Sequence, residues 1–192
     1  MNEFHSLKDE GIDIQTLEKL AGKGELVTIE EDSSGNLQNV TAGIIIDAPV
    51  NEVWQIVTDY NRYHEFLPQT KRVRILKQSG DTAEVEYNLK LAVSVVGIGI
   101  DYILRHTHQK PDRIHFELVS GDLAEVRGGW ELIPTAGGEK TLAFYSVFTD
   151  LKSLGRVASF ALKQEPSMEL AINVSSAVLI VKAVKERTES YI

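Results

Sequence analysis

The C-terminal part of the chain carries one apolar stripe at helical spacing. Pro166 suits the first turn of a helix of about twenty residues, where a missing N–H costs little. Glu169, Asn173 and Ser176 fall on the opposite, polar face. The stripe consists of Leu170, Val174, Ala177, Val178, Val181 and Val184, which recur three or four residues apart. A stripe of this length needs a partner surface to pack against.

The segment directly before this helix, residues 154–163, also has apolar residues at helical spacing. Pro166 separates the two segments as a kink or a short break. We expect the earlier segment to act as a movable lip beside a long helix that stays packed.

Between Pro68 and Phe148 the apolar residues alternate with polar ones, which is typical of antiparallel strands. The clearest runs are 83–91, 98–104 and 114–118. Turn-forming sequences separate successive runs, at 79–81, 110–112, 120–122 and 136–138. This spacing indicates successive hairpins and not crossover connections.

The N-terminal part predicts shorter elements. Residues 1–12 are polar and patternless, and we expect a mobile tail there, followed by a short helix that Gly22 and Gly24 end. Two strands, 25–31 and 37–47, flank a turn-rich sequence. Asp47 is the expected cap of the next helix, with Pro49 in its first turn, and residues 60–68 form a second short helix.

These elements predict an α+β fold in which a curved antiparallel sheet wraps around the long C-terminal helix, with two short helices after the first strand region. We expect two parts: residues 1–24 as a tail and short helix, and residues 25–190 as a single domain. At 192 residues with 43% hydrophobic residues, the chain suits one globular core.

Composition excludes several classes of function. A formal charge of −8 argues against a general nucleic-acid binder. The chain has no cysteine, so disulfides and thiolate metal sites are excluded. The N-terminus has no apolar signal core, and no window approaches eighteen uninterrupted apolar residues. We therefore expect a cytoplasmic protein without stable membrane insertion.

One motif resembles a known family. Ala48-Pro49, Val53-Trp54, Val57, Asp59-Tyr60, Tyr63 and Phe66-Leu67-Pro68 are similar to the start of the polyketide cyclase/dehydrase and lipid-transport proteins. That superfamily, with the helix-grip fold, includes Bet v 1 allergens and START lipid-transfer domains. The sequence DYNRYHEFLP looks most like the branch of coenzyme Q-binding proteins and ribosome-association toxins, which also carries a glycine, tryptophan and proline like those of GWELIP at 129–134. The resemblance covers about residues 38–188.

The resemblance implies that the protein binds or transports a hydrophobic small molecule, such as a lipid, an isoprenoid quinone or a polyketide-like ring, between the sheet and the C-terminal helix. It also leaves two alternatives open. One is a polyketide aromatase/cyclase that uses the same cavity, and the other is a protein-interaction role of the ribosome-association toxin type.

A metal site is the first chemical possibility. His106 and His108 lie two residues apart and share one face of a strand. His115 would be the third ligand, but the alternation of the next strand and a three-residue turn at 110–112 place it on the other face. His64-Glu65 begins like a zincin motif, but Pro68 occupies the position of the second histidine. We expect no metal and no cofactor.

Acid–base chemistry is harder to exclude. The chain has no G-x-S-x-G sequence and no phosphate-binding glycine loop, so an ordinary hydrolase is not indicated. Tyr102 and His106 lie four residues apart on one strand face and are the candidate catalytic pair, although buried tyrosines and histidines more often only satisfy hydrogen bonds. The expected ligand-binding residues are Tyr63, Phe66, Tyr87, Tyr102, Leu104, His106, Phe116, Trp130, Leu170, Val174 and Val178. Tyr63 is expected at the mouth, with Phe66 buried.

Overall fold

The structure, a computed structural model, describes residues 11, 13–93, 96–155, 162 and 167–191. Its strands are β1 (Leu26–Glu31), β2 (Leu37–Ile46), β3 (Thr70–Ser79), β4 (Thr82–Val93), β5 (Val96–Gln109), β6 (Arg113–Gly121), β7 (Val126–Thr135) and β8 (Lys140–Thr149). Its α-helices are α1 (Ile14–Ala21), α2 (Val50–Thr58), α3 (Tyr63–Phe66) and α5 (Ser167–Glu189), with single 3-10 turns η1 (Tyr60–Arg62), η2 (Ala136–Gly138) and η3 (Leu151–Ser153).

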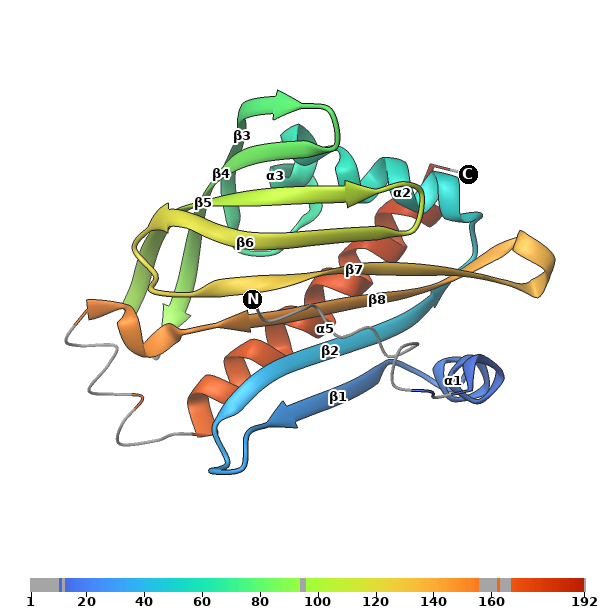
Figure 1. Cartoon of the computed structure of the whole chain (residues 1–192), viewed down its shortest axis with the longest axis horizontal. Helices are drawn as coiled ribbons and strands as arrows, with labels where there is room; N and C mark the ends of the chain where they lie inside the picture. The colour runs from blue at the N-terminus through green and yellow to red at the C-terminus, as the bar shows by residue number, and fades with distance from the viewer. Residues whose placement is uncertain (1–10, 12, 94–95, 156–161, 163–166, 192) are drawn as a thin grey trace.

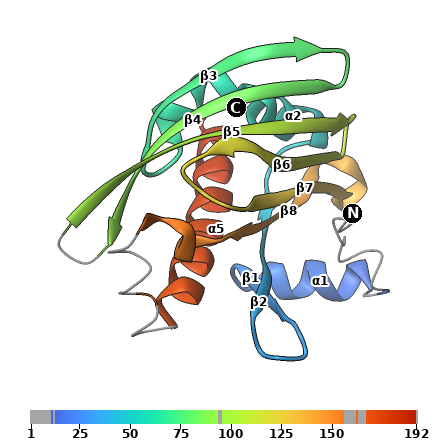
Figure 2. The ribbon, with the colours of Figure 1, turned by 60° about the vertical axis from the view of Figure 1, so that its left-hand side comes forward.

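The strands form one antiparallel sheet in the order β1-β2-β8-β7-β6-β5-β4-β3. The sheet curls, and α5 runs along its concave face while α2 and α3 lie near the C-terminal end of that helix (Figures 1 and 2). Sequential strands from β3 to β8 are antiparallel neighbours, and the predicted turns at 79–81, 110–112, 120–122 and 136–138 fall between such pairs. The predicted helix-grip α+β architecture is therefore confirmed.

The main core lies between the concave face and α5. Ala177, Val181 and Val184 of the predicted stripe are fully buried in the same apolar cluster as inner-face residues such as Val40 and Val85. Apolar burial of this kind contributes roughly 25 cal/mol per Å² removed from water. The long stripe thus has the partner surface that the sequence required.

Two residues assigned to the polar face of α5 are buried instead. Glu169 pairs with Lys152 at 2.6 Å, and Asn173 hydrogen-bonds the backbone of Thr149 at the end of β8. The reason is that the first turns of α5 face the exposed backbone at the end of a strand, which needs polar partners. Further along, the Lys185 ammonium donates to the Ile45 carbonyl at 2.8 Å, so α5 is fixed to the sheet near both ends.

A second, smaller core lies on the other face of the sheet. Leu17 and Ala21 of α1 pack over Ile133, Leu142 and Phe144. The predicted short helix is confirmed, and the Asp13 carboxylate caps it by accepting from the Thr16 N–H at 3.0 Å. The helix therefore covers an apolar patch that the sheet would otherwise expose.

The predicted cap of the next helix is wrong. Pro49 is the N-cap of α2, and no side chain caps that helix. Asp47 lies two residues before this N-cap and instead pairs with Lys140 at 2.7 Å, while its N–H donates to the Glu189 carboxylate. The expected tail at 1–12 apart from residue 11, most of the expected lip at 154–163 and the break at Pro166 lie outside the described residues.

Among the described helices, α5 alone has the length and mean hydropathy to cross a membrane. A core helix meets the same criteria, and here one side of α5 packs on the sheet.

Candidate ligand-binding cavity

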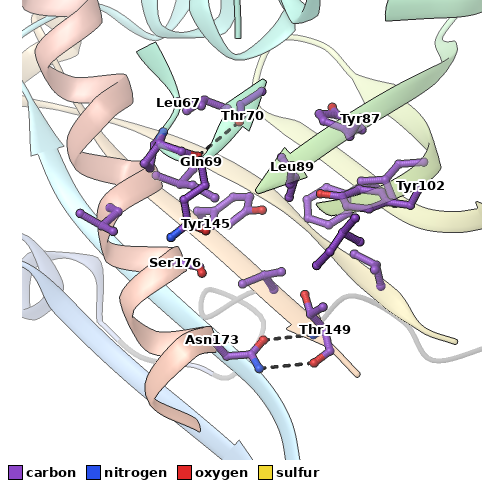
Figure 3. Close-up of a pocket in the computed structure, with 18 of the residues that line it drawn as sticks. Leu67, Gln69, Thr70, Tyr87, Leu89, Tyr102, Tyr145, Thr149, Asn173 and Ser176 are labelled. Atoms are coloured by element: carbon purple, nitrogen blue, oxygen red, sulfur yellow. Dashed lines mark hydrogen bonds between the residues drawn. The ribbon is translucent and has the colours of Figure 1, made fainter. Parts of the chain in front are cut away.

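A cavity lies between the concave face of the sheet, the segment after α3 and one side of α5. Its lining is mostly aliphatic and aromatic, with uncharged polar groups. The residues are Tyr63, Leu67, Pro68, Gln69, Thr70, Tyr87, Leu89, Ile100, Tyr102, Leu104, His106, Phe116, Leu123, Val126, Trp130, Tyr145, Val147, Thr149, Leu151, Ile172, Asn173, Ser176, Leu179 and Ile180. Gln69 and Leu179 are exposed to solvent and mark the opening, beside which Figure 3 shows Gln69 and Ser176.

The cavity is small. The volume open to the centre of a water molecule is about 120 Å³. On this measure about 10–15 Å³ holds one water, so the cavity has room for about ten water-sized groups. None of the described residues that line it is Asp, Glu, Lys or Arg. Together these facts describe a site for a small molecule that is largely apolar.

One wall is built from two neighbouring strands. Tyr87 of β4 and Tyr102 of β5 are directly paired in the sheet, and their rings stack with centroids 5.4 Å apart. The Tyr87 hydroxyl lies 2.9 Å from Nε2 of His106, four residues further along β5 on the same face. The predicted pair Tyr102 and His106 does face one cavity, and Tyr87 connects them.

The imidazole of His106 is neutral. Burial, with His108 and His115 nearby, lowers the pKa of His106 to about 3. Its Nδ1 atom has no hydrogen-bond partner among the described residues. The Tyr60 ring packs against that of His106 with centroids 4.5 Å apart, and its hydroxyl lies 2.6 Å from Nε2 of His108, so Tyr60 and His108 support this wall from behind without lining the cavity.

Two phenol groups point into the cavity from opposite sides. Figure 3 shows the hydroxyls of Tyr102 on β5 and Tyr145 on β8 directed toward each other across the space. Neither hydroxyl has a hydrogen-bond partner in the part of the chain that the structure describes. Burial raises the pKa of both groups above the usual range, with a further contribution from Tyr102 to that of Tyr145. Both are therefore neutral phenols with a free hydrogen-bond donor.

The polar groups at the other end of the cavity are arranged differently. The Asn173 side chain accepts from the Thr149 N–H at 3.1 Å and donates to the carbonyls of Thr149 and Glu169, which ties α5 to the end of β8. Figure 3 shows the two bonds to Thr149 and the Ser176 hydroxyl above them. Asn173 is fully engaged in holding the wall together.

The structure places most of the expected ligand-binding residues in the lining. These are Tyr63, Tyr87, Tyr102, Leu104, His106, Phe116 and Trp130. Tyr63 is buried, with its hydroxyl donating to the Val57 carbonyl at 2.5 Å, and so the prediction that it stands at the mouth is wrong. Phe66 is only partly buried and lies outside the lining, next to Arg187, whose guanidinium is 5.4 Å from its ring.

The three residues predicted from α5 lie outside the lining as well. Leu170, Val174 and Val178 are partly buried against the core, whereas Ile172, Ser176 and Ile180 line the cavity. The two rows are offset by two residues, which is about 200° around a helix. The cavity therefore lies along one side of the buried stripe of α5, whereas the three predicted residues lie along its other side.

Sequence reasoning missed several cavity residues. Tyr145 sits opposite Trp130 in the β7–β8 pairing, with ring centroids 4.7 Å apart, and a correct register of those two strands would have found it. Leu67, Gln69 and Thr70 follow α3 in the lining. Leu67 belongs to the Phe66-Leu67-Pro68 part of the family motif, whereas Gln69 and Thr70 carry no sequence pattern that marks them. Asn173 was predicted on the polar face of the helix, and its polarity alone gives no sign that it lines the cavity.

The expected register of the histidines is confirmed. His106 pairs with Phe116, and His115 pairs with Thr107 on the outer face. No cluster of three or more histidine, aspartate or glutamate residues suited to a metal ion occurs in the described ranges.

The fold and the cavity together define a helix-grip protein of the ligand-binding type. Residues 46–172, more than half of the chain, match the family model described as polyketide cyclase / dehydrase and lipid transport, and the chain belongs to this family. Both activities in that description act on hydrophobic small molecules. No curated protein matches the sequence significantly.

Solved structures share the fold at low identity. The aromatase/cyclase Zhui from Streptomyces sp. R1128 is 19% identical, with a TM-score of 0.63 over 79% of this chain and 93% of its own. A STAR-related lipid transfer protein from Xanthomonas axonopodis is 15% identical, with a TM-score of 0.62 over 85% of this chain and 98% of the solved fragment. The protein TTHA0849 from Thermus thermophilus is 19% identical, with a TM-score of 0.64 over 80% of this chain and 99% of its own.

Proposed function

We propose that this protein binds a small, largely apolar molecule in the cavity between the sheet and α5, and that it acts as a carrier and not as an enzyme. The observation that carries the proposal is the cavity itself, which is lined by apolar and aromatic side chains and contains a few convergent uncharged polar groups. Such a site is the usual architecture for small-molecule recognition. The solved relatives include a lipid transfer protein and an aromatase/cyclase, which is compatible with a carrier and with the alternative enzyme.

The size of the cavity limits which ligands can fit inside it. Room for about ten water-sized groups suits one small ring system, or one end of a larger molecule whose remainder leaves through the opening at Gln69 and Leu179. Among the ligand classes that the family suggests, a ring with a short substituent fits inside the cavity, whereas a long isoprenoid or acyl chain must extend past the opening.

The electrostatics favour binding over proton transfer. A general acid or base works best when its pKa lies near the working pH. Burial lowers the pKa of His106 to about 3 and raises the pKa of the Tyr102 and Tyr145 hydroxyls, so each group is held in its neutral form. These groups are suited to orient a polar atom of the ligand. The aromatase/cyclase alternative draws its support from the same tyrosines and from His106, which line the space where a polyketide carbonyl would lie.

The test is native mass spectrometry of protein purified from its own host, followed by titration with the molecule that is found. Trp130 lines the cavity and Trp54 does not, so binding should alter fluorescence in a Trp54→Phe variant and leave it unaltered in a Trp130→Phe variant. Protein that is always isolated empty and that binds no lipid, quinone or aromatic ketone would contradict the carrier proposal. Turnover of a poly-β-ketone that Tyr102→Phe or His106→Ala abolishes without unfolding would replace it with the cyclase.

A further inference from the structure

The polar groups of the cavity carry information about the ligand beyond its hydrophobicity. All lining residues that the structure describes are uncharged, and the neighbouring ion pairs, such as Lys152 with Glu169, do not line the cavity. A buried anion without a partner is strongly disfavoured in such surroundings. The ligand portion inside the cavity is therefore expected to be neutral.

The phenol groups of Tyr102 and Tyr145 are the groups that can recognise a polar atom of the ligand. Tyr102 and Tyr145 come from strands on different parts of the curved sheet, and their hydroxyls converge on the same space (Figure 3). Two further phenols of the lining are engaged, Tyr87 with His106 and Tyr63 with the Val57 carbonyl, and behind the lining Tyr60 is engaged with His108. Tyr102 and Tyr145 differ from these because no partner for their hydroxyls occurs among the described residues.

Both hydroxyls reach the cavity space without a partner from the described residues, so a bound molecule can accept from both. One carbonyl oxygen has two lone pairs and can accept from two donors at once. Aromatic rings stand around this position, with Tyr87 stacked on Tyr102 and Phe116 stacked against Tyr145 at 5.8 Å. These walls suit a flat substituent on the carbonyl.

We infer that the cavity selects an uncharged aromatic carbonyl compound, whose oxygen accepts hydrogen bonds from the Tyr102 and Tyr145 hydroxyls, and that it discriminates against carboxylates of the same shape. This inference rests on the proposed function and adds the chemical class of the ligand. It assigns Tyr145, on β8, a recognition role equal to that of Tyr102.

Three probes of nearly equal size separate the effects of apolar burial, of a carbonyl acceptor and of a negative charge on binding. They are ethylbenzene, acetophenone and benzoate, each titrated against the protein at neutral pH by two-dimensional NMR. Burial of apolar surface alone makes ethylbenzene the tightest ligand, because it has no polar group to desolvate. Two hydrogen bonds to the ketone should reverse that order and favour acetophenone by about tenfold. Benzoate should bind more weakly than acetophenone by about a hundredfold or more.

Tyrosine-to-phenylalanine variants show whether the preference for the ketone comes from the Tyr102 and Tyr145 hydroxyls. In Tyr102→Phe/Tyr145→Phe the preference for acetophenone should disappear and ethylbenzene should bind more tightly, while in Tyr191→Phe, an exposed tyrosine outside the cavity, the wild-type order should persist. Thermal unfolding of each variant checks that it is folded, and the single variants Tyr102→Phe and Tyr145→Phe serve if the double variant is not.

Each outcome is decisive. Tighter binding of ethylbenzene by the wild-type protein, or equal binding of benzoate and acetophenone, overturns the inference and leaves the carrier proposal standing. Failure of all three probes to bind also overturns the inference, and the carrier proposal is then decided separately by the native mass spectrometry and the titrations with lipids and quinones.

Discussion

The hydroxyl oxygen of Tyr87 lies 2.9 Å from Nε2 of His106, and this contact joins two neighbouring strands inside the cavity wall. The imidazole is 4% exposed and surrounded by the rings of Tyr60, Tyr87 and Phe116. A charged imidazolium would have no carboxylate partner among the described residues that line this wall. His106 therefore links protonation to the stability of the whole fold.

Stability should fall as the pH drops below about 6.5. Burial lowers the pKa of His106 from 6.5 to about 3 in the folded protein, so the unfolded chain binds the proton first. The stabilisation is complete above the unfolded pKa and is lost as the pH falls toward the folded pKa. Between pH 7 and pH 5 this group should cost about 2 kcal/mol of unfolding free energy.

Urea unfolding at both pH values tests this for wild type and His106→Gln. The variant should lose less stability on acidification than wild type does. The exposed His64 offers the control, and His64→Gln should keep the wild-type pH dependence. An identical pH dependence in wild type and His106→Gln would contradict the assignment.

Replacing Asn173 should weaken the attachment of α5 to the sheet. The side chain bonds both backbone groups of Thr149 and is 2% exposed. Asn173→Ala leaves these groups unpaired and should destabilise the fold by about 1–3 kcal/mol. Asn173→Asp should cost at least as much at neutral pH, because it removes the donor and buries a charge. Thermal unfolding measures both, and the exposed Ser175→Ala serves as the control, expected within about 0.5 kcal/mol of wild type.

Gly43→Ala should destabilise the protein through one aromatic ring. A Cβ atom at Gly43 would lie 2.4 Å from Cε1 of Phe144, its partner residue across the β2–β8 pair. That ring is buried beneath α1, so we expect a cost of about 1–3 kcal/mol. The double variant Gly43→Ala/Phe144→Leu should recover part of the loss. Gly99→Ala meets no atom within 4 Å and is the matched control, measured by the same denaturant unfolding.

Removal of residues 1–22 should leave a cooperative fold of lower stability. The main core is separate from the small outer core that α1 covers. Loss of Leu17 and its contacts exposes Ile133, Leu142 and Phe144, and the point change Leu17→Ala alone should cost about 2–3 kcal/mol. Calorimetry should show one transition with a lower midpoint. Two separate transitions, or no folded protein, would contradict the division at residue 24.

The sheet and its hairpins were predictable because alternation fixes which residues share a face. The register that places His115 on the outer face follows from three alternating residues and one short turn. The same rule places Tyr87, Tyr102 and His106 on the inner face, whereas the direct pairing of Tyr87 with Tyr102 is seen only in the structure.

Which side of the buried stripe of α5 faces the cavity was not predictable, because apolar residues lie on both sides of that stripe. Ile172, Leu179 and Ile180 are as hydrophobic as Leu170, Val174 and Val178, and only tertiary packing decides between them. Glu169 and Asn173 were misplaced for a related reason: helical periodicity records polarity but does not show that a strand end needs polar partners. Asp47 was expected as a helix cap, but a basic side chain on the neighbouring strand engages it.

The attachment of α5 near both ends bears on how a ligand enters. Asn173 holds the first turns to β8, and Lys185 holds the last turns to the Ile45 carbonyl of β2. Ser176, Leu179 and Ile180 lie between these two anchors and line the cavity. The backbone of α5 is therefore fixed to the sheet on both sides of the cavity. We expect a ligand to enter beside the middle of the helix through movement of side chains, with the hydrogen bonds of Asn173 and Lys185 intact.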